Sequence, residues 1–122
     1  MPESGFEVQP FHPADAEQVA LLFRKVYGES YPVRMVYDPV QLVAACESGR
    51  YFPFVVRAAD GHVVGYGALF PSAPFGGVYE FGQGVVSAEF RGAGIGRLLF
   101  EHVEQFPGLF LYAREHQVIG AP

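Results

Sequence analysis

The sequence has one cysteine, no tryptophan, few charged residues and no long apolar run, and each shortage narrows the class of protein. A lone cysteine, Cys46, excludes an intramolecular disulfide and fits a reducing compartment. No apolar stretch reaches the roughly 20 residues of a membrane-spanning helix. The first residues, Met1 to Gly5, lack the basic and apolar blocks of a secretory leader. We therefore expect a cytoplasmic protein that does not cross a membrane.

The low content of charged residues and the sign of the net charge indicate which kinds of binding partner are expected. Charged residues make up 17% of the chain, against about a quarter in an average domain, and the net charge is −5. An acidic chain is poorly suited to phosphate backbones, so we expect no nucleic-acid partner. The histidines, His12, His62, His102 and His116, lie far apart, and none belongs to a Cys/His cluster. We therefore expect no metal site.

Apolar and aromatic residues are abundant, at 50% hydrophobic with 12 Phe and 7 Tyr. They supply a core for one domain of 122 residues. Hydrophobic periodicity and turn residues predict both helices and strands. The expected elements, in order, are a strand over 6–11, a helix from Pro13 to Tyr27, a helix that Pro39 opens and Gly49 ends, strands over 51–58, 62–70 and 78–86, a helix over 94–105 and a strand over 109–113.

Two short-range signals in this series are the most specific. Asp38 before Pro39 is typical of a helix start, because the carboxylate caps the first N–H groups and proline suits the first helical position. Gln41 completes a pair that resembles a capping box. The dipeptide Asp60-Gly61 between two apolar runs predicts the tight turn of a β-hairpin.

The stretch with the most chemical content joins the strand over 78–86 to the helix over 94–105. Residues 91–97 read RGAGIGR. Glycine lets a backbone turn sharply or approach a ligand closely. The N–H groups in a helix's first turn have no intrahelical partner, and together with the helix dipole they form an anion site. The stretch therefore predicts a cradle for a pyrophosphate, and a glycine-rich turn without a ligand is the alternative.

The spacing of the glycines distinguishes between the known phosphate-binding motifs. A Rossmann fingerprint, Gly-x-Gly-x-x-Gly, would need its third glycine elsewhere, and no Gly-Lys-Ser/Thr run is present for a P-loop. The stretch resembles motif A of the GNAT superfamily of N-acetyltransferases, Gln/Arg-x-x-Gly-x-Gly/Ala. Arg91, Gly94 and Gly96 fill its three fixed positions. The apolar pairs Val85-Val86 before it and Leu98-Leu99 after it also fit.

The resemblance implies an α+β fold of three layers around a mixed, mainly antiparallel sheet, in the order β-α-α-β-β-β-α-β. It covers residues 1–122 as a single truncated domain, without the final helix and β-hairpin of a complete GNAT domain. The family's usual acid tyrosine lies on that final helix and is not placed here. Tyr112, in the strand over 109–113, is another candidate proton donor, although a packed strand tyrosine is the commoner role.

The resemblance also implies acetyl-CoA as the acyl donor. Main-chain N–H groups from Gly92 to Arg97 would hold its phosphates, and the Arg97 cation would either assist or simply be solvated. The strand end would pair with the pantetheine arm, and the Val86 N–H would polarise the thioester carbonyl. The candidate cofactor-binding residues are Val85, Val86, Arg91, Gly92, Ala93, Gly94, Ile95, Gly96 and Arg97.

One carboxylate is a candidate for the base that keeps the amine neutral. Glu80 lies eleven residues before Arg91. In the histone-acetyltransferase-like branch of the GNAT superfamily, which the sequence resembles, the catalytic glutamate occupies the matching position on this strand. Regular alternation groups Glu80, Gly82 and Gly84 on one face, and Tyr79, Phe81, Gln83 and Val85 on the other. The first face would leave room for a substrate, and an apolar wall would raise the pKa of Glu80. A solvent-facing glutamate beside a bulge is the alternative.

These implications predict an N-acetyltransferase that moves an acetyl group to a primary amine by direct attack on the thioester. The acceptor is a small-molecule or peptide amine. The alternative is a non-catalytic acyl-CoA-binding or interaction module that needs a partner or the missing C-terminal segment. Residues 109–112 are apolar at every position, and such a strand left bare at a sheet edge favours association. We therefore expect a homodimer, or completion of the fold by another chain.

Overall fold

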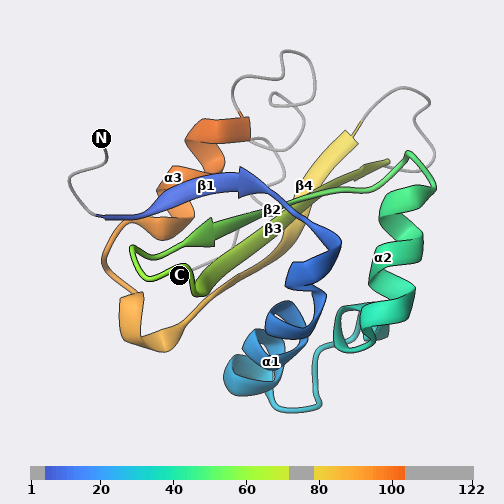
Figure 1. Cartoon of the computed structure of the whole chain (residues 1–122), viewed down its shortest axis with the longest axis horizontal. Coiled ribbons are helices and arrows are strands. Elements are labelled where there is room, and N and C mark those ends of the chain that lie inside the picture. Colours follow the sequence, from blue (N-terminus) through green and yellow to red (C-terminus); the bar gives the residue numbers. More distant parts are fainter. Residues whose placement is uncertain (1–4, 72–78, 104–122) are drawn as a thin grey trace.

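A single antiparallel sheet with helices on both faces forms the centre of the structure (Figure 1). The computed structural model describes residues 5–71 and 79–103. The strands lie in the order β1-β2-β3-β4, each antiparallel to its neighbour. They are β1 (Glu7–Pro10), β2 (Phe52–Arg57), β3 (Val63–Pro71) and β4 (Tyr79–Val86).

The helices divide between the two faces of the sheet (Figure 1). They are α1 (Ala16–Tyr27), α2 (Pro39–Glu47) and α3 (Ile95–Val103). On the face that α1 and α2 cover, the core contains the fully buried Phe23 and Leu42. On the opposite face, α3 packs a second core that contains Phe81 and Leu99. The expected α+β fold of three layers is therefore confirmed for the described residues.

The two short-range signals form the expected local structures. The Asp38 carboxylate accepts hydrogen bonds from the N–H groups of Val40 at 3.0 Å and Gln41 at 3.3 Å, and so caps α2. The turn between β2 and β3 closes with Gly61, whose φ is +91°. Its N–H donates to the Ala58 carbonyl at 2.9 Å. Both structures depend on a few consecutive residues, which is why the sequence predicts them.

The first helix begins later than predicted. Residues Pro13–Asp15 form a 3₁₀ turn, and α1 starts at Ala16. The buried Asp15 carboxylate holds this turn, because it accepts from the His12 N–H at 2.9 Å and pairs with Arg57 of β2 at 2.8 Å. An ion pair across 42 residues of sequence is invisible to local periodicity. The first strand is also shorter than predicted, at Glu7–Pro10.

The segment over 28–37, between the first two predicted helices, contains structure of its own. Its last residues, Arg34–Tyr37, form a 3₁₀ turn. The Tyr37 hydroxyl donates to the Gly28 carbonyl at 2.8 Å and accepts from the Tyr31 N–H at 3.0 Å. The Arg34 guanidinium lies over the Tyr37 ring, 4.4 Å from its centroid. One buried tyrosine therefore ties both ends of this segment together.

β4 contains a bulge next to β3. Ala68 pairs with Gly82, whereas Tyr66 pairs with Val85, so β4 has one more residue than β3 between these two pairs. Gln83 lies in this extra length, and its φ is +56°. A positive φ is uncommon for a residue other than glycine, and here it marks the point where the regular pleat is interrupted.

The bulge overturns the predicted assignment of faces in β4. Phe81 packs in the core beneath α3, whereas Val85 packs in the core beneath α1 and α2. The prediction that Phe81 and Val85 share a face, with Glu80, Gly82 and Gly84 on the other, is therefore wrong. Period-two alternation fails across a bulge because the inserted residue reverses every side chain that follows.

Two predicted features lie outside the described residues. They are the strand over 109–113 with Tyr112, and the last residues of the helix predicted over 94–105. The described part of α3 ends at Val103. Among residues 5–71 and 79–103, no helix has the length and apolar character to cross a bilayer.

Candidate functional site

β4 leads into the glycine-rich loop through a short 3₁₀ turn. The buried Ser87 donates its N–H to the Val64 carbonyl at 2.8 Å, which extends the pairing of β3 and β4 by one step. The turn Ala88–Phe90 follows. The Ala93 N–H then donates to the Phe90 carbonyl at 3.0 Å. The path of the loop is therefore held mainly by hydrogen bonds of its own backbone.

Two of the three glycines in this loop are required by the backbone itself. Gly92 has a φ of +91° and Gly94 a φ of +84°, values that side chains with a Cβ rarely adopt. The Leu98 N–H donates to the Gly94 carbonyl at 2.9 Å, so Gly94 caps α3. The N–H groups in the first turn of α3 have no acceptor carbonyl within the helix. With the helix dipole, they make this end of α3 suited to an anion.

The third glycine, Gly96, has no such explanation. It lies within α3, and a Cβ added there would meet no described atom within 4 Å. Glycine costs a helix about 1 kcal/mol relative to alanine. Close approach of a ligand to the helix start would account for glycine at this position. The residues Arg91 and Arg97, close to Gly96 in the chain, are both exposed, and a guanidinium is well suited to pair with a phosphate.

The start of α3 is fixed against the sheet by Ile95. This side chain is 1% exposed and packs on β3 at Gly65. A Cβ at Gly65 would lie 2.7 Å from the Ile95 Cγ2 atom, closer than two carbon atoms can pack. The absent side chain of Gly65 therefore lets α3 begin where it does. The loop is positioned by packing at its end as well as by its own backbone.

The outer edge of β4 offers a backbone donor next to this loop. β4 is the last strand of the sheet that the described residues form. Because the Ser87 N–H is directed to β3, alternation along the strand directs the Val86 N–H to the opposite edge. A ligand lying along that edge and ending at α3 would meet both the Val86 N–H and the glycine loop.

The predicted base is only partly located. The backbone of Glu80 belongs to β4 and pairs with Phe70 of β3. The side chain of Glu80 lies outside what the structure describes. The predicted cofactor residues are better defined, because Val85 and Val86 end β4 and residues 91–97 follow in the loop and the first turn of α3. These residues form one continuous path, while the role of Glu80 stays a prediction.

A network of tyrosines that no sequence pattern predicts reaches the bulge. The Tyr66 hydroxyl lies 2.5 Å from the Tyr51 hydroxyl, which in turn donates to the Gln83 side-chain oxygen. On the adjacent residue, the Gly84 carbonyl accepts from the Tyr27 hydroxyl at 3.3 Å. Burial raises the pKa of both Tyr51 and Tyr66 above the ordinary value of a phenol, so the folded state disfavours the charged phenolate at both positions. No local pattern links Tyr51 to a residue 32 positions later.

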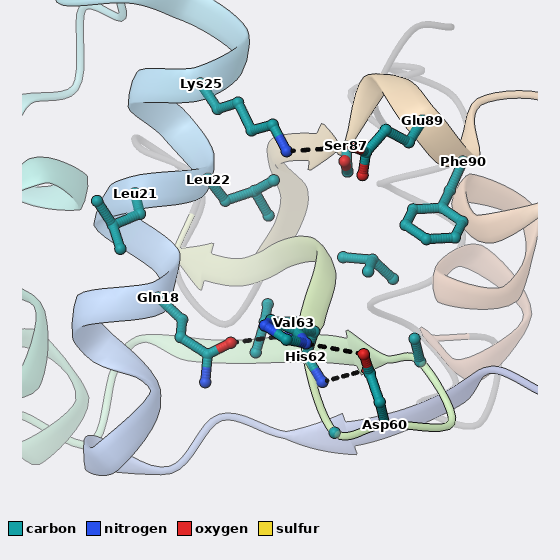
Figure 2. A pocket seen from close by; sticks show the side chains of 13 residues that line it. Gln18, Leu21, Leu22, Lys25, Asp60, His62, Val63, Ser87, Glu89 and Phe90 are labelled. Atoms are coloured by element: carbon teal, nitrogen blue, oxygen red, sulfur yellow. Dashed lines mark hydrogen bonds and ion pairs between the residues drawn. The ribbon is translucent and has the colours of Figure 1, made fainter.

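A cleft of about 670 Å³ lies next to the loop, between α1, the β2–β3 turn and residues 87–90 (Figure 2). Its charged groups pair with one another. Lys25 Nζ lies 3.6 Å from the Glu89 carboxylate, and His62 Nδ1 lies 2.9 Å from the Asp60 carboxylate. Hydrogen bonds from His62 lower the pKa of Asp60. Residues 91–97 do not line this cleft, so it is separate from the candidate anion site.

The comparison with protein families identifies the chain. Residues 16–115 match the model of the acetyltransferase (GNAT) family. This range contains α1, α2, β2 to β4, the glycine loop and α3. The chain belongs to the GNAT acetyltransferase family. The predicted resemblance, which rested on Arg91, Gly94 and Gly96, is therefore confirmed.

Solved structures share the fold of this GNAT protein. The ribosomal-protein-S5-alanine acetyltransferase of Vibrio fischeri superposes with a TM-score of 0.60 and 20% identity, over 82% of this chain and 62% of that one. A GNAT acetyltransferase of Brucella melitensis, solved with acetyl-CoA, gives 0.63 and 21%, over 82% and 67%. The smu.2055 protein of Streptococcus mutans gives 0.65 and 26%, over 82% and 67%.

The chain spans less than two thirds of the length of the Vibrio enzyme, so the likeness covers only part of that protein. At 20% and 21% identity, the Vibrio and Brucella structures show a common fold and not a common substrate. No curated protein matches this chain.

Proposed function

We propose that this GNAT protein is an acetyl-CoA-dependent N-acetyltransferase that transfers the acetyl group to a primary amine. The observation that carries the proposal is the continuous path from the Val86 N–H to the first turn of α3. Membership of the family and the acetyl-CoA complex of the Brucella structure support the choice of ligand.

The path supplies two of the three groups that acetyl transfer needs. The N–H groups around Gly94 and Gly96 would bind the pyrophosphate, with Arg97 adding charge. The outward Val86 N–H would donate to the thioester carbonyl and stabilise the oxyanion that forms on attack. The amine nitrogen bonds to the carbonyl carbon and loses a proton, the C–S bond breaks, and the CoA thiolate leaves and takes up one proton, so that the products are the amide and the free thiol.

The third group is a base, and we propose Glu80 for it. An amine attacks only as the free base, so a carboxylate near the acceptor has to take a proton from the ammonium form. We expect Glu80→Gln to lower turnover by about 100-fold while acetyl-CoA affinity is nearly unchanged, as for a general base. Steady-state release of CoA thiol over a range of pH measures this, with exposed Glu101→Gln on α3 as the matched control. Unchanged turnover in Glu80→Gln would remove Glu80 from the mechanism.

Binding and turnover together test the proposed function. Isothermal titration with acetyl-CoA should show saturable binding, and a panel of small-molecule and peptide amines should show thiol release with at least one. Saturable binding with no turnover on any amine would favour the alternative, a non-catalytic acyl-CoA-binding module. The absence of binding would contradict both.

We also propose that the protein acts in the cytoplasm as a homodimer, or with a second chain that completes the fold. The support is the apolar segment over 109–112 in the sequence, which suits a covered strand. Multi-angle light scattering at micromolar concentration should give the mass of a dimer. A monodisperse monomer would contradict this proposal and leave the acetyltransferase proposal intact.

A further inference from the structure

The bulge in β4 decides which backbone group reaches the outer edge of the sheet. With the extra residue, Val86 pairs with Gly65 and its N–H is directed away from β3. Without that residue, the pairing beyond the bulge would slip by one position. Val85 would then oppose Gly65, and its N–H would face outward in place of that of Val86. The side chains of both valines would also exchange faces.

The bulge depends on an unfavourable backbone conformation. Gln83 has a φ of +56°, which residues other than glycine adopt infrequently. Such conformations persist where surrounding contacts hold them, and they are concentrated at functional sites. The contacts at this point are therefore informative about function.

Two tyrosines from other elements hold the bulge. The buried Tyr51, which precedes β2, donates its hydroxyl hydrogen to the Gln83 side-chain oxygen. Tyr51 is itself fixed by the fully buried Tyr66 of β3, whose hydroxyl lies 2.5 Å away. From the last residue of α1, the Tyr27 hydroxyl donates to the Gly84 carbonyl at 3.3 Å. Gln83 and Gly84, the two residues of β4 between the pairs at Gly82 and Val85, are thus each bonded to a tyrosine.

We propose that Tyr51, acting through Gln83, is a positioning residue that holds the bulge and so sets the Val86 N–H for the acetyl thioester. Tyr27 has a secondary part, because it bonds to the backbone of Gly84 from a more exposed position. The inference rests on the proposed function. It adds that the register of the binding edge depends on a tyrosine that does not belong to the edge itself.

The decisive experiment compares two ligands in Tyr51→Phe. Acetyl-CoA would use both the strand edge and the glycine loop, whereas 3′-phospho-ADP, the nucleotide half of CoA, would use the loop alone. We expect Tyr51→Phe to bind acetyl-CoA about tenfold more weakly, as for one lost buried hydrogen bond. Its affinity for 3′-phospho-ADP should stay within about twofold of wild type, since the loop is unaffected.

A rescue by backbone chemistry separates positioning from a general loss of stability. Glycine adopts a positive φ without strain, so Gln83→Gly should keep the bulge without the tyrosine. The double variant Tyr51→Phe/Gln83→Gly should therefore recover acetyl-CoA affinity. Gln83→Val opposes a positive φ and should weaken acetyl-CoA binding more than Tyr51→Phe does. The matched control is Tyr37→Phe, which loses a similarly buried hydroxyl that bonds to Gly28 and Tyr31 and leaves the Tyr51–Gln83 bond.

The outcomes are distinct. Wild-type affinity in Tyr51→Phe, an equal loss for both ligands, or an equal loss in Tyr37→Phe would overturn the positioning role while the proposed function stands. If wild-type protein binds neither ligand, the proposed function fails and the inference with it. If Tyr51→Phe does not fold, the comparison of Gln83→Gly with Gln83→Val still tests the inference. Equal acetyl-CoA affinities in these two variants would overturn it.

Discussion

The glycines of β3 and those of the loop before α3 differ in what surrounds them. A Cβ at Gly67 would lie 2.5 Å from the Phe81 ring, and a Cβ at Gly65 would lie 2.7 Å from Ile95. At Gly94 and Gly96, a Cβ would meet no described atom within 4 Å. The strand glycines are small because protein fills the space above them. The loop glycines leave space that the described chain does not fill.

This difference separates glycines that the packed core requires from glycines with open space around them, and at Gly96 that space lies in the first turn of α3. Replacing a glycine in β3 should reduce stability, because the core is close-packed and cannot absorb a methyl group. Replacing Gly96, whose φ is not positive, should reduce binding with little change in stability, whereas a residue with a Cβ at Gly92 or Gly94 would also strain the backbone. Three predictions test this contrast and a fourth concerns His102 in α3, beginning with the largest expected effect.

Gly94→Asp should weaken acetyl-CoA binding by about 100-fold or more, because a carboxylate would enter the path of the phosphates. Isothermal titration measures the affinity. Gly94→Asn is the matched control, since it has nearly the same shape without the charge and tolerates the same positive φ. Equal affinities in Gly94→Asp and wild type, with the fold intact, would show that no phosphate binds at this loop.

Gly67→Ala should lower the free energy of unfolding by about 3 kcal/mol, because the new methyl group would overlap the buried Phe81 ring. Urea denaturation measures the change. Phe81→Leu in the same chain should recover part of the loss by removing the ring atoms that clash. An unchanged free energy of unfolding in Gly67→Ala would contradict the difference in packing between the glycines of β3 and those of the loop.

Gly96→Ala adds the same methyl group as Gly67→Ala, but at a position where no described atom lies within 4 Å of it. Its free energy of unfolding should be unchanged or higher by up to about 1 kcal/mol, since alanine favours a helix. Its acetyl-CoA affinity should fall about tenfold, as for one displaced hydrogen bond to a charged phosphate. Urea denaturation and titration on one sample give both values. A lower free energy of unfolding together with unchanged acetyl-CoA affinity would show that Gly96 has a structural role and does not contact the ligand.

The smallest effect concerns the packed end of α3. The His102 ring lies 5.0 Å from that of Phe54, and burial lowers the pKa of His102 below 6.5. The folded state therefore disfavours the charged ring, and the unfolded state takes up the proton first as the pH falls. Stability present above about pH 6.5 should decline below that value.

Thermal unfolding at about pH 7.5 and 5.5 checks this titration. The fall in Tm should be smaller by about a degree or two in His102→Phe than in wild type. An identical fall in both proteins would show that His102 does not contribute to the pH dependence.

Local chemistry made several features predictable. Asp38 and Pro39 start α2, and the dipeptide Asp60-Gly61 turns the hairpin, because each structure is completed within a few consecutive residues. The glycine loop is equally local. Its two positive φ angles and its cap at Gly94 involve only neighbouring residues, so residues 91–97 could be recognised from the sequence.

Tertiary structure decided which faces and groups the site presents. Phe81 and Val85 lie on opposite faces because Gln83 adopts a positive φ that Tyr51 holds from 32 residues away. The direction of the Val86 N–H follows from the same bulge. The sequence alone therefore determined where the loop and its helix lie along the chain, because backbone conformation there is local. Only packing between distant segments determined the register in which β4 meets the loop, since no short stretch contains both partners.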